Sequence, residues 1–144
     1  MYDAQRAIEY AARWAHGRNP RWGDFTLLGG DCTNFASQCL YAGGCPMAYA
    51  PEGWFYRSMR DRAPAWSGCR ELRRYLLQSG RGQPAEAALP GDLIFLSDGR
   101  RVYHVVVAIR GGADPLVAAH TRDAYLAPLS GYDARAAYVI RPLR

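Results

Sequence analysis

The chain has 144 residues, which is enough for one domain with its own core, and we expect a single domain over residues 1–144. Its hydrophobic fraction of 49% and aromatic fraction of 12% favour a folded globule over a disordered tail. The net charge of +5 is carried by scattered arginines with no lysine, which is typical of a solvated surface, and no apolar run is long enough to span a bilayer. We therefore expect a monomer with no nucleic-acid partner and no membrane partner.

The first half of the chain is predicted to be helical. A helix over residues 2–16 has apolar side chains at three-to-four spacing and Asp3 as its N-cap. A second helix is predicted over residues 32–41, and a third over residues 68–78 with Ser67 as its N-cap. The opening segment is charged and helix-like rather than a secretory signal. This predicts a cytoplasmic location, or a secreted or wall-associated one if the chain is a processed piece.

The second half is predicted to consist of strands. Apolar or β-branched runs cover residues 91–97, 102–110, 116–121 and 136–141, and turn residues separate them. An Asp-Gly pair at 98–99 indicates a hairpin between the first two runs. Helices followed by an antiparallel meander make an α+β domain.

The four cysteines do not indicate a metal site. They include no C-x-x-C pair, and the three histidines lack the spacing of a zinc knuckle, so we expect no metal and no cofactor. A domain of this size does not need disulfides, and a nucleophilic cysteine has to stay reduced, so free thiols are predicted. Cys39, Cys45 and Cys69 are interpreted as small structural hydrophobic residues.

Cys32 differs from the other cysteines because of its position. With Asp31 as N-cap, it is the first residue of the second helix, where unpaired N–H groups and the helix dipole favour an anion. This position predicts a lowered thiol pKa and N–H donors for the oxyanion of a tetrahedral intermediate. Gly29 and Gly30 just before it would let a substrate backbone approach closely.

Two histidines are candidates for the base that a nucleophilic cysteine needs. Gly112 lies within the predicted turn of a hairpin; His104 lies eight residues before it, and His120 lies eight residues after it. This symmetry predicts that the two imidazoles are cross-strand neighbours on one face of the sheet, although a single bulge would change the register. One ring would take the thiol proton while the other fixes its tautomer. Two polar residues on an exposed sheet face are the alternative, and Asp123 is a second, off-register candidate for the orienting residue.

Several motifs occur together in a recognisable order. The segments "GGDCTNFASQCLYAGG", "PGDLIF", "HVVVAI" and "AAHT" resemble the bacterial putative amidase domain, a family related to the NlpC-type and CHAP-type cysteine hydrolases of the papain-like superfamily. The resemblance covers nearly the whole chain, and it implies a papain-like fold with N-terminal helices packed on an antiparallel sheet.

The resemblance also implies roles for individual residues. It makes Cys32 the nucleophile, His104 the base, and His120 the third polar residue, which orients His104. The glutamine that papain-like enzymes use as an oxyanion donor has no counterpart here, so Asn34 or a backbone N–H is the candidate donor, with Gly30 beside the substrate. The implied substrates are peptide stems of the bacterial cell wall or similar peptide-like amides.

Two further interpretations remain open from the sequence. The aromatic residues of the middle stretch either wall a substrate groove or cover the seam between helices and sheet; they are Trp54, Phe55, Tyr56 and Trp66. If they form a groove without a reactive thiol, the protein is a non-catalytic module that binds peptide or glycan. A Cys/His metal protein is a third possibility, and it predicts bound zinc.

Overall fold

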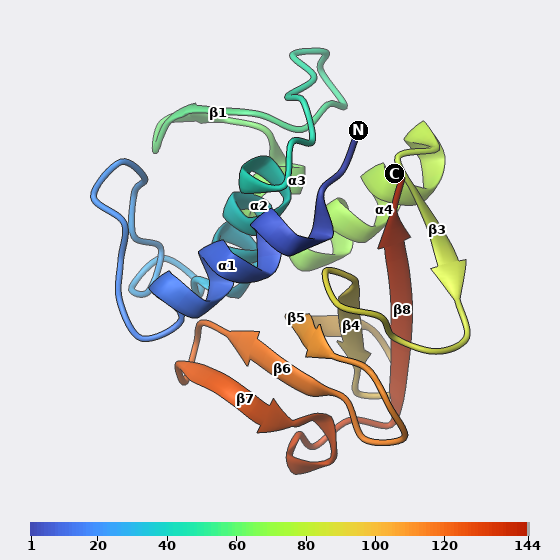
Figure 1. Cartoon of the computed structure of the whole chain (residues 1–144). Coiled ribbons are helices and arrows are strands. Elements are labelled where there is room, and N and C mark those ends of the chain that lie inside the picture. The colour runs from blue at the N-terminus through green and yellow to red at the C-terminus, as the bar shows by residue number, and fades with distance from the viewer. Residues whose placement is uncertain (144) are drawn as a thin grey trace.

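The computed structural model describes residues 1–143, and in this range the chain has an α+β architecture in which helices cover one face of a six-stranded antiparallel sheet (Figure 1). The elements in chain order are α1 (Ala4–Trp14), α2 (Cys32–Ala42), β1 (Tyr56–Ser58), β2 (Asp61–Arg62), α3 (Pro64–Ser67), α4 (Cys69–Ser79), β3 (Gly82–Ala85), β4 (Leu93–Ser97), β5 (Val102–Arg110), β6 (Leu116–Ala119), β7 (Ala124–Pro128), the 3-10 helix η1 (Leu129–Gly131) and β8 (Ala136–Pro142). None of the helices in residues 1–143 combines the length and the apolarity needed to cross a bilayer.

The three predicted helices are confirmed as α1, α2 and α4, and two of their predicted ends can be compared directly. Asp3 caps α1, because its carboxylate accepts a hydrogen bond from the N–H of Arg6 at 3.2 Å. The predicted N-cap of α4 is wrong by one residue. Ser67 is the last residue of the short helix α3, and Gly68, with an extended backbone, is the N-cap of α4.

The sheet has the strand order β3-β8-β4-β5-β6-β7. The predicted strands are confirmed as β4, β5, β6 and β8. Of these, β4, β5 and β6 pair in consecutive order as expected of a meander, but β8 lies between β3 and β4 and does not continue it. The sequence did not predict β3 and β7, which are the two edge strands. Neither has the regular apolar alternation of a half-buried strand, and β3 contains Pro84, which an edge position tolerates.

The sheet has a hydrophobic cluster on each face. The larger cluster lies between the sheet and the helices and includes Phe35 of α2, Trp66 of α3 and Val105 of β5. The smaller cluster lies on the opposite face, where Leu96 and Val106 pack with the segment around η1. The start of α2 therefore meets β5 from the side of the larger cluster.

Candidate active site

Cys32 is the first residue of α2, as predicted, and is half-buried against the larger cluster. Its Sγ lies 3.7 Å from Thr33 Oγ1 and receives hydrogen bonds from the backbone N–H groups of Val105 and Thr33. Burial raises the pKa of the Cys32 thiol above its ordinary value and outweighs these hydrogen bonds, which lower it. The expectation of a lowered pKa is therefore wrong: desolvation dominates over the helix terminus, and the resting group is a neutral thiol.

Asp31 occupies the N-cap position of α2, but its side chain makes no capping hydrogen bond there. Instead its Oδ1 accepts hydrogen bonds from the Phe25 N–H at 2.7 Å and from Asn34 Nδ2 at 2.9 Å. Its Oδ2 lies 2.5 Å from His120 Nδ1. The side chain is completely buried, and these partners satisfy its carboxylate in place of the first-turn N–H groups.

His120 follows the end of β6, and its ring is buried and stacked on Phe35 with centroids 4.1 Å apart. Nδ1 donates to the Asp31 carboxylate. Nε2 lies 2.8 Å from the Trp14 carbonyl oxygen and 3.2 Å from Arg18 Nη1, so it either donates to the carbonyl or accepts from the guanidinium. Both ring nitrogens are thus engaged, and neither is engaged with His104.

The predicted pairing of His104 with His120 is wrong by one residue. The structure pairs Val107 with Ala118 and Ala108 with Val117. Symmetry about Gly112 would instead pair Val107 with Val117 and Ala108 with Leu116. The turn is centred on Ala113 rather than Gly112, since Arg110 pairs with Leu116, and a register shift between Ala108 and Arg110 then leaves the pairing one residue away from the predicted one. Since successive side chains of a strand point to opposite faces, a shift of one residue separates the two rings.

His104 lies near the start of β5 and is buried. It pairs with Leu96, and its ring packs on Tyr132 at 5.6 Å between centroids; both neighbours belong to the smaller cluster on the face away from the helices. Burial lowers the pKa of His104 to about 4, so the ring is a neutral imidazole at pH 7. Neither ring nitrogen of His104 has a hydrogen-bond partner among residues 1–143, so no hydrogen bond joins His104 to Cys32.

Tyr132 contacts the His104 ring near Cys32, and no pattern in the sequence indicated this place for it. Its phenol pKa is raised, mainly by burial; the nearby Arg122 lowers it, and the negative charge of an ionised Cys32 would raise it further. Tyr132 therefore lies within electrostatic range of the thiol as well as in contact with the His104 ring. His104 also directly precedes Val105, whose N–H contacts the Cys32 sulfur.

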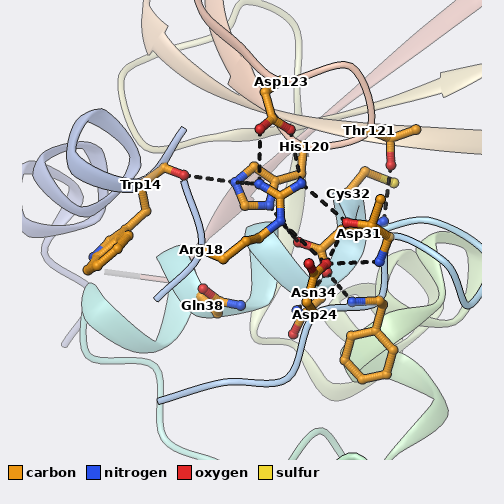
Figure 2. Close-up of polar contacts among 12 residues, drawn as sticks. Trp14, Arg18, Asp24, Asp31, Cys32, Asn34, Gln38, His120, Thr121 and Asp123 are labelled. Carbon is orange, nitrogen blue, oxygen red and sulfur yellow. Dashed lines mark hydrogen bonds and ion pairs between the residues drawn. The ribbon is translucent and has the colours of Figure 1, made fainter. Parts of the chain in front are cut away.

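Arg18, in the loop after α1, is the second residue that sequence reasoning missed. Figure 2 shows its guanidinium between Asp123, His120 and Asp31. It donates two hydrogen bonds to Asp123, at 3.0 and 3.2 Å, and its Nε lies 3.6 Å from Asp31 Oδ2 and 3.4 Å from Asp24 Oδ1. Asp123, predicted as an alternative partner of His104, pairs with Arg18 instead.

The predicted oxyanion donor Asn34 has no side-chain proton to spare. Its Nδ2 donates to the Gly23 carbonyl at 2.8 Å and to Asp31 Oδ1, while its Oδ1 accepts from Trp66 Nε1 at 2.8 Å. Gly30 has a φ of +106°, and a Cβ there would lie 3.1 Å from Thr121 Oγ1. The conformation explains why glycine stands at this position, while its contact with a substrate stays a prediction.

Of the four aromatic residues of the middle stretch, the two tryptophans are core residues. Trp54 and Trp66 are both buried, stack with centroids 5.0 Å apart, and donate their indole N–H groups to Ser37 and Asn34. Tyr56 is half-buried, and its hydroxyl accepts a hydrogen bond from the Gly23 N–H at 2.8 Å. Of the two interpretations, the structure supports the seam between helices and sheet for the two tryptophans.

The cysteines and the remaining titratable groups form no metal centre in the described residues. All four cysteines are free thiols. Within residues 1–143, no group of three or more His, Cys, Asp and Glu side chains is arranged to hold a metal ion.

Comparison with known proteins places the chain in a family. The family model described as "putative amidase domain" matches residues 1–140. The chain is also 36% identical over 149 aligned positions to the uncharacterized protein YhbB of Bacillus subtilis (strain 168), an alignment that covers 94% of this chain and 47% of that protein. The chain thus spans about half the length of this relative. No solved structure matches the chain significantly. Because the family model covers nearly its full length, the chain belongs to the family described as a putative amidase domain.

Proposed function

We propose that the protein is a cysteine hydrolase of amide bonds with a papain-like arrangement, in which Cys32 is the nucleophile and His104 the base. The description of the family indicates amide hydrolysis in general. One observation supports the cysteine mechanism above all others. Cys32 opens a helix whose first-turn N–H groups receive no side-chain cap, and one of these, the N–H of Thr33, already contacts the sulfur.

The uncapped helix terminus suits the charge that develops when a thiol attacks an amide. The carbonyl oxygen becomes an oxyanion, and backbone N–H groups at a helix N-terminus are oriented donors for such a charge. This assigns to the backbone the oxyanion role that the sequence suggested for the Asn34 side chain. It also explains how a papain-like site can work without the upstream glutamine.

The reaction starts from two neutral groups. As the bond between Cys32 Sγ and the carbonyl carbon forms, the thiol proton moves to the His104 imidazole and the carbonyl π electrons move to oxygen. Collapse of the tetrahedral intermediate breaks the C–N bond, and His104 returns the proton to the leaving amine. Water then hydrolyses the thioester with His104 as base. His104 lies with Leu96 and Tyr132 on the face of the sheet away from the helices, so the proposal requires its ring to turn toward the Cys32 thiol in the complex with substrate.

The proposed substrates are peptide-like amides, and stem peptides of the bacterial cell wall are the first class to test. The competing idea of a non-catalytic module for peptide or glycan depended on exposed tryptophans. Trp54 and Trp66 are buried in the core, so neither offers a surface for a sugar or a peptide.

The test compares hydrolysis by wild type, Cys32→Ser, His104→Gln and Cys45→Ser, the last being a control because Cys45 is an equally half-buried cysteine at the other end of α2. Release of new amino groups from soluble wall peptides is measured, together with trapping of the acyl-enzyme by mass spectrometry. We expect Cys32→Ser and His104→Gln to lose release and Cys45→Ser to retain it. Full activity of Cys32→Ser would refute the nucleophile, and full activity of His104→Gln would refute the base.

A further inference from the structure

We propose that the buried pair of Asp31 and His120, braced by Arg18, holds the N-cap carboxylate away from the first turn of α2 and so keeps that turn open for the oxyanion. This assigns His120 a positioning role that acts through Asp31, in place of the expected role of orienting His104. The inference rests on the proposed function for its catalytic meaning, but its structural content concerns the helix terminus alone.

The starting observation is an aspartate that occupies an N-cap position without capping. Aspartate is among the preferred N-cap residues because its carboxylate accepts hydrogen bonds from the second and third N–H groups of a helix. In α2 the carboxylate of Asp31 makes no such bond. A carboxylate that did cap the helix would occupy the donors that an oxyanion needs, and its negative charge would oppose a second one.

The contacts of Asp31 explain why it does not cap. Oδ2 receives the Nδ1 proton of His120 at 2.5 Å, and Oδ1 receives the backbone N–H of Phe25 at 2.7 Å. Both side chains of the pair are almost fully excluded from solvent, at 0% and 1% exposure, so water does not replace either partner. In such surroundings a carboxylate stays with its hydrogen-bond donors, because an unpaired buried charge is strongly unfavourable.

His120 is itself held in one orientation. Its ring stacks on Phe35, and its Nε2 is fixed between the Trp14 carbonyl and Arg18. Arg18 extends the cluster to Asp123 through two hydrogen bonds and lies 3.6 Å from Asp31 Oδ2 (Figure 2). The loop before α2 and the turn after β6 are therefore joined by one polar cluster.

The turn after β6 shows that this arrangement is under strain. Thr121 and Arg122 have φ values of +60° and +64°, a region that side-chain-bearing residues rarely adopt. Thr121 Oγ1 accepts the backbone N–H of Asp31 at 3.0 Å, so the strained turn also fixes the backbone at the N-cap. Such conformations persist where surrounding contacts hold them. Here these contacts converge on Asp31.

The experiment compares two substitutions of His120 that differ in one hydrogen bond. In His120→Asn the side-chain amide can replace the Nδ1 donor, whereas in His120→Gln the amide reaches the Nε2 position and leaves Asp31 Oδ2 without that donor. Backbone amide proton shifts of α2 residues 32–34 are measured by NMR on wild type and both variants, and thermal unfolding verifies that each is folded. We expect downfield shifts of first-turn amides in His120→Gln, as the carboxylate turns to cap them, and little change in His120→Asn.

Kinetics on the same proteins connect the capping state to catalysis. We expect His120→Gln to lower kcat by about 10²-fold with little change in KM, because oxyanion donors act in the transition state, and His120→Asn to retain most of the activity. Alkylation of Cys32 by iodoacetamide creates no oxyanion but depends on the thiolate, which the Thr33 N–H favours, so in His120→Gln its rate should fall by a much smaller factor than kcat. An equal fold-decrease of alkylation and kcat would show that the whole effect acts on the thiol or its base, and it would overturn the inference.

The NMR result decides the structural part even if the protein hydrolyses no amide. Unshifted first-turn amides in a folded His120→Gln protein would refute the capping switch, whatever the activity. Shifted amides with an unchanged kcat on a cleaved substrate would refute its role in catalysis. Failure of the proposed function shows up separately, as an absence of amide hydrolysis by wild type or as full activity of Cys32→Ser.

Discussion

The burial of His104 predicts that acid destabilises this protein through one identifiable group. Burial lowers the pKa of His104 from 6.5 to about 4, so on acidification the unfolded chain takes up the proton before the folded chain does. The contribution to stability is complete above pH 6.5 and is lost as the pH falls toward 4. Its full size is about 3 kcal/mol, of which about 2 kcal/mol is lost between pH 8 and pH 5.

The assay is urea unfolding of wild type and His104→Gln at several pH values from 8 to 5. Other groups titrate in this range too, and they contribute equally to both proteins, so the difference between the two free energies of unfolding isolates His104. We expect wild type to lose about 2 kcal/mol more than His104→Gln on going from pH 8 to pH 5. Parallel pH dependences of the two proteins would show that the imidazole is not desolvated and would remove the neutral base from the proposed mechanism.

Two further predictions concern the surroundings of Cys32. Gly30→Ala should destabilise the fold by at least about 1 kcal/mol in thermal unfolding, because φ is +106° and the new Cβ would lie 3.1 Å from Thr121 Oγ1. Gly29→Ala should cost less, because its φ is +96° but open space surrounds it. A larger loss of stability in Gly29→Ala than in Gly30→Ala would contradict this. Trp66→Phe should lower the free energy of unfolding by about 1–3 kcal/mol beyond the loss of packing, because the buried Asn34 Oδ1 loses its donor at 2.8 Å. A stability equal to wild type would show that Asn34 finds another partner.

The sequence predicted the elements around the site well where the signal was local. The N-terminus of α2 and four of the sheet strands follow from apolar periodicity and turn residues, so Cys32 was placed correctly at its helix terminus. The edge strands β3 and β7 lack that periodicity, because an edge strand is shaped by its single neighbour and by solvent. The register of the two histidines failed for a different reason. Neither the centre of the turn at Ala113 nor the register shift between Ala108 and Arg110 has a sequence signature here, and a shift of one residue moves every later side chain to the other face.

The sequence predicts that Asp31 lies at the N-cap of α2, but it does not predict the hydrogen-bond partners of Asp31. An aspartate before a helix predicts a cap. Nothing in the local sequence indicates that two distant side chains bind its carboxylate instead: His120, which lies 89 positions later, and Arg18, which lies in the loop after α1. The outcome depends on burial. In water the first-turn N–H groups would be the nearest donors, but in a dry site an imidazole N–H at 2.5 Å prevails.

The neutral resting pair and the uncapped helix are connected in the proposed mechanism. An ion pair of thiolate and imidazolium starts the reaction with its charges already formed, so attack on the carbonyl only moves a negative charge from sulfur to oxygen. With the pKa of Cys32 raised and that of His104 lowered to about 4, this site starts without charges and has to create both at the moment of attack. A base that binds protons so weakly offers little driving force for the transfer. Stabilisation of the oxyanion therefore has to supply a larger share of the rate, and this is the condition under which keeping the Asp31 carboxylate off the first turn of α2 matters most.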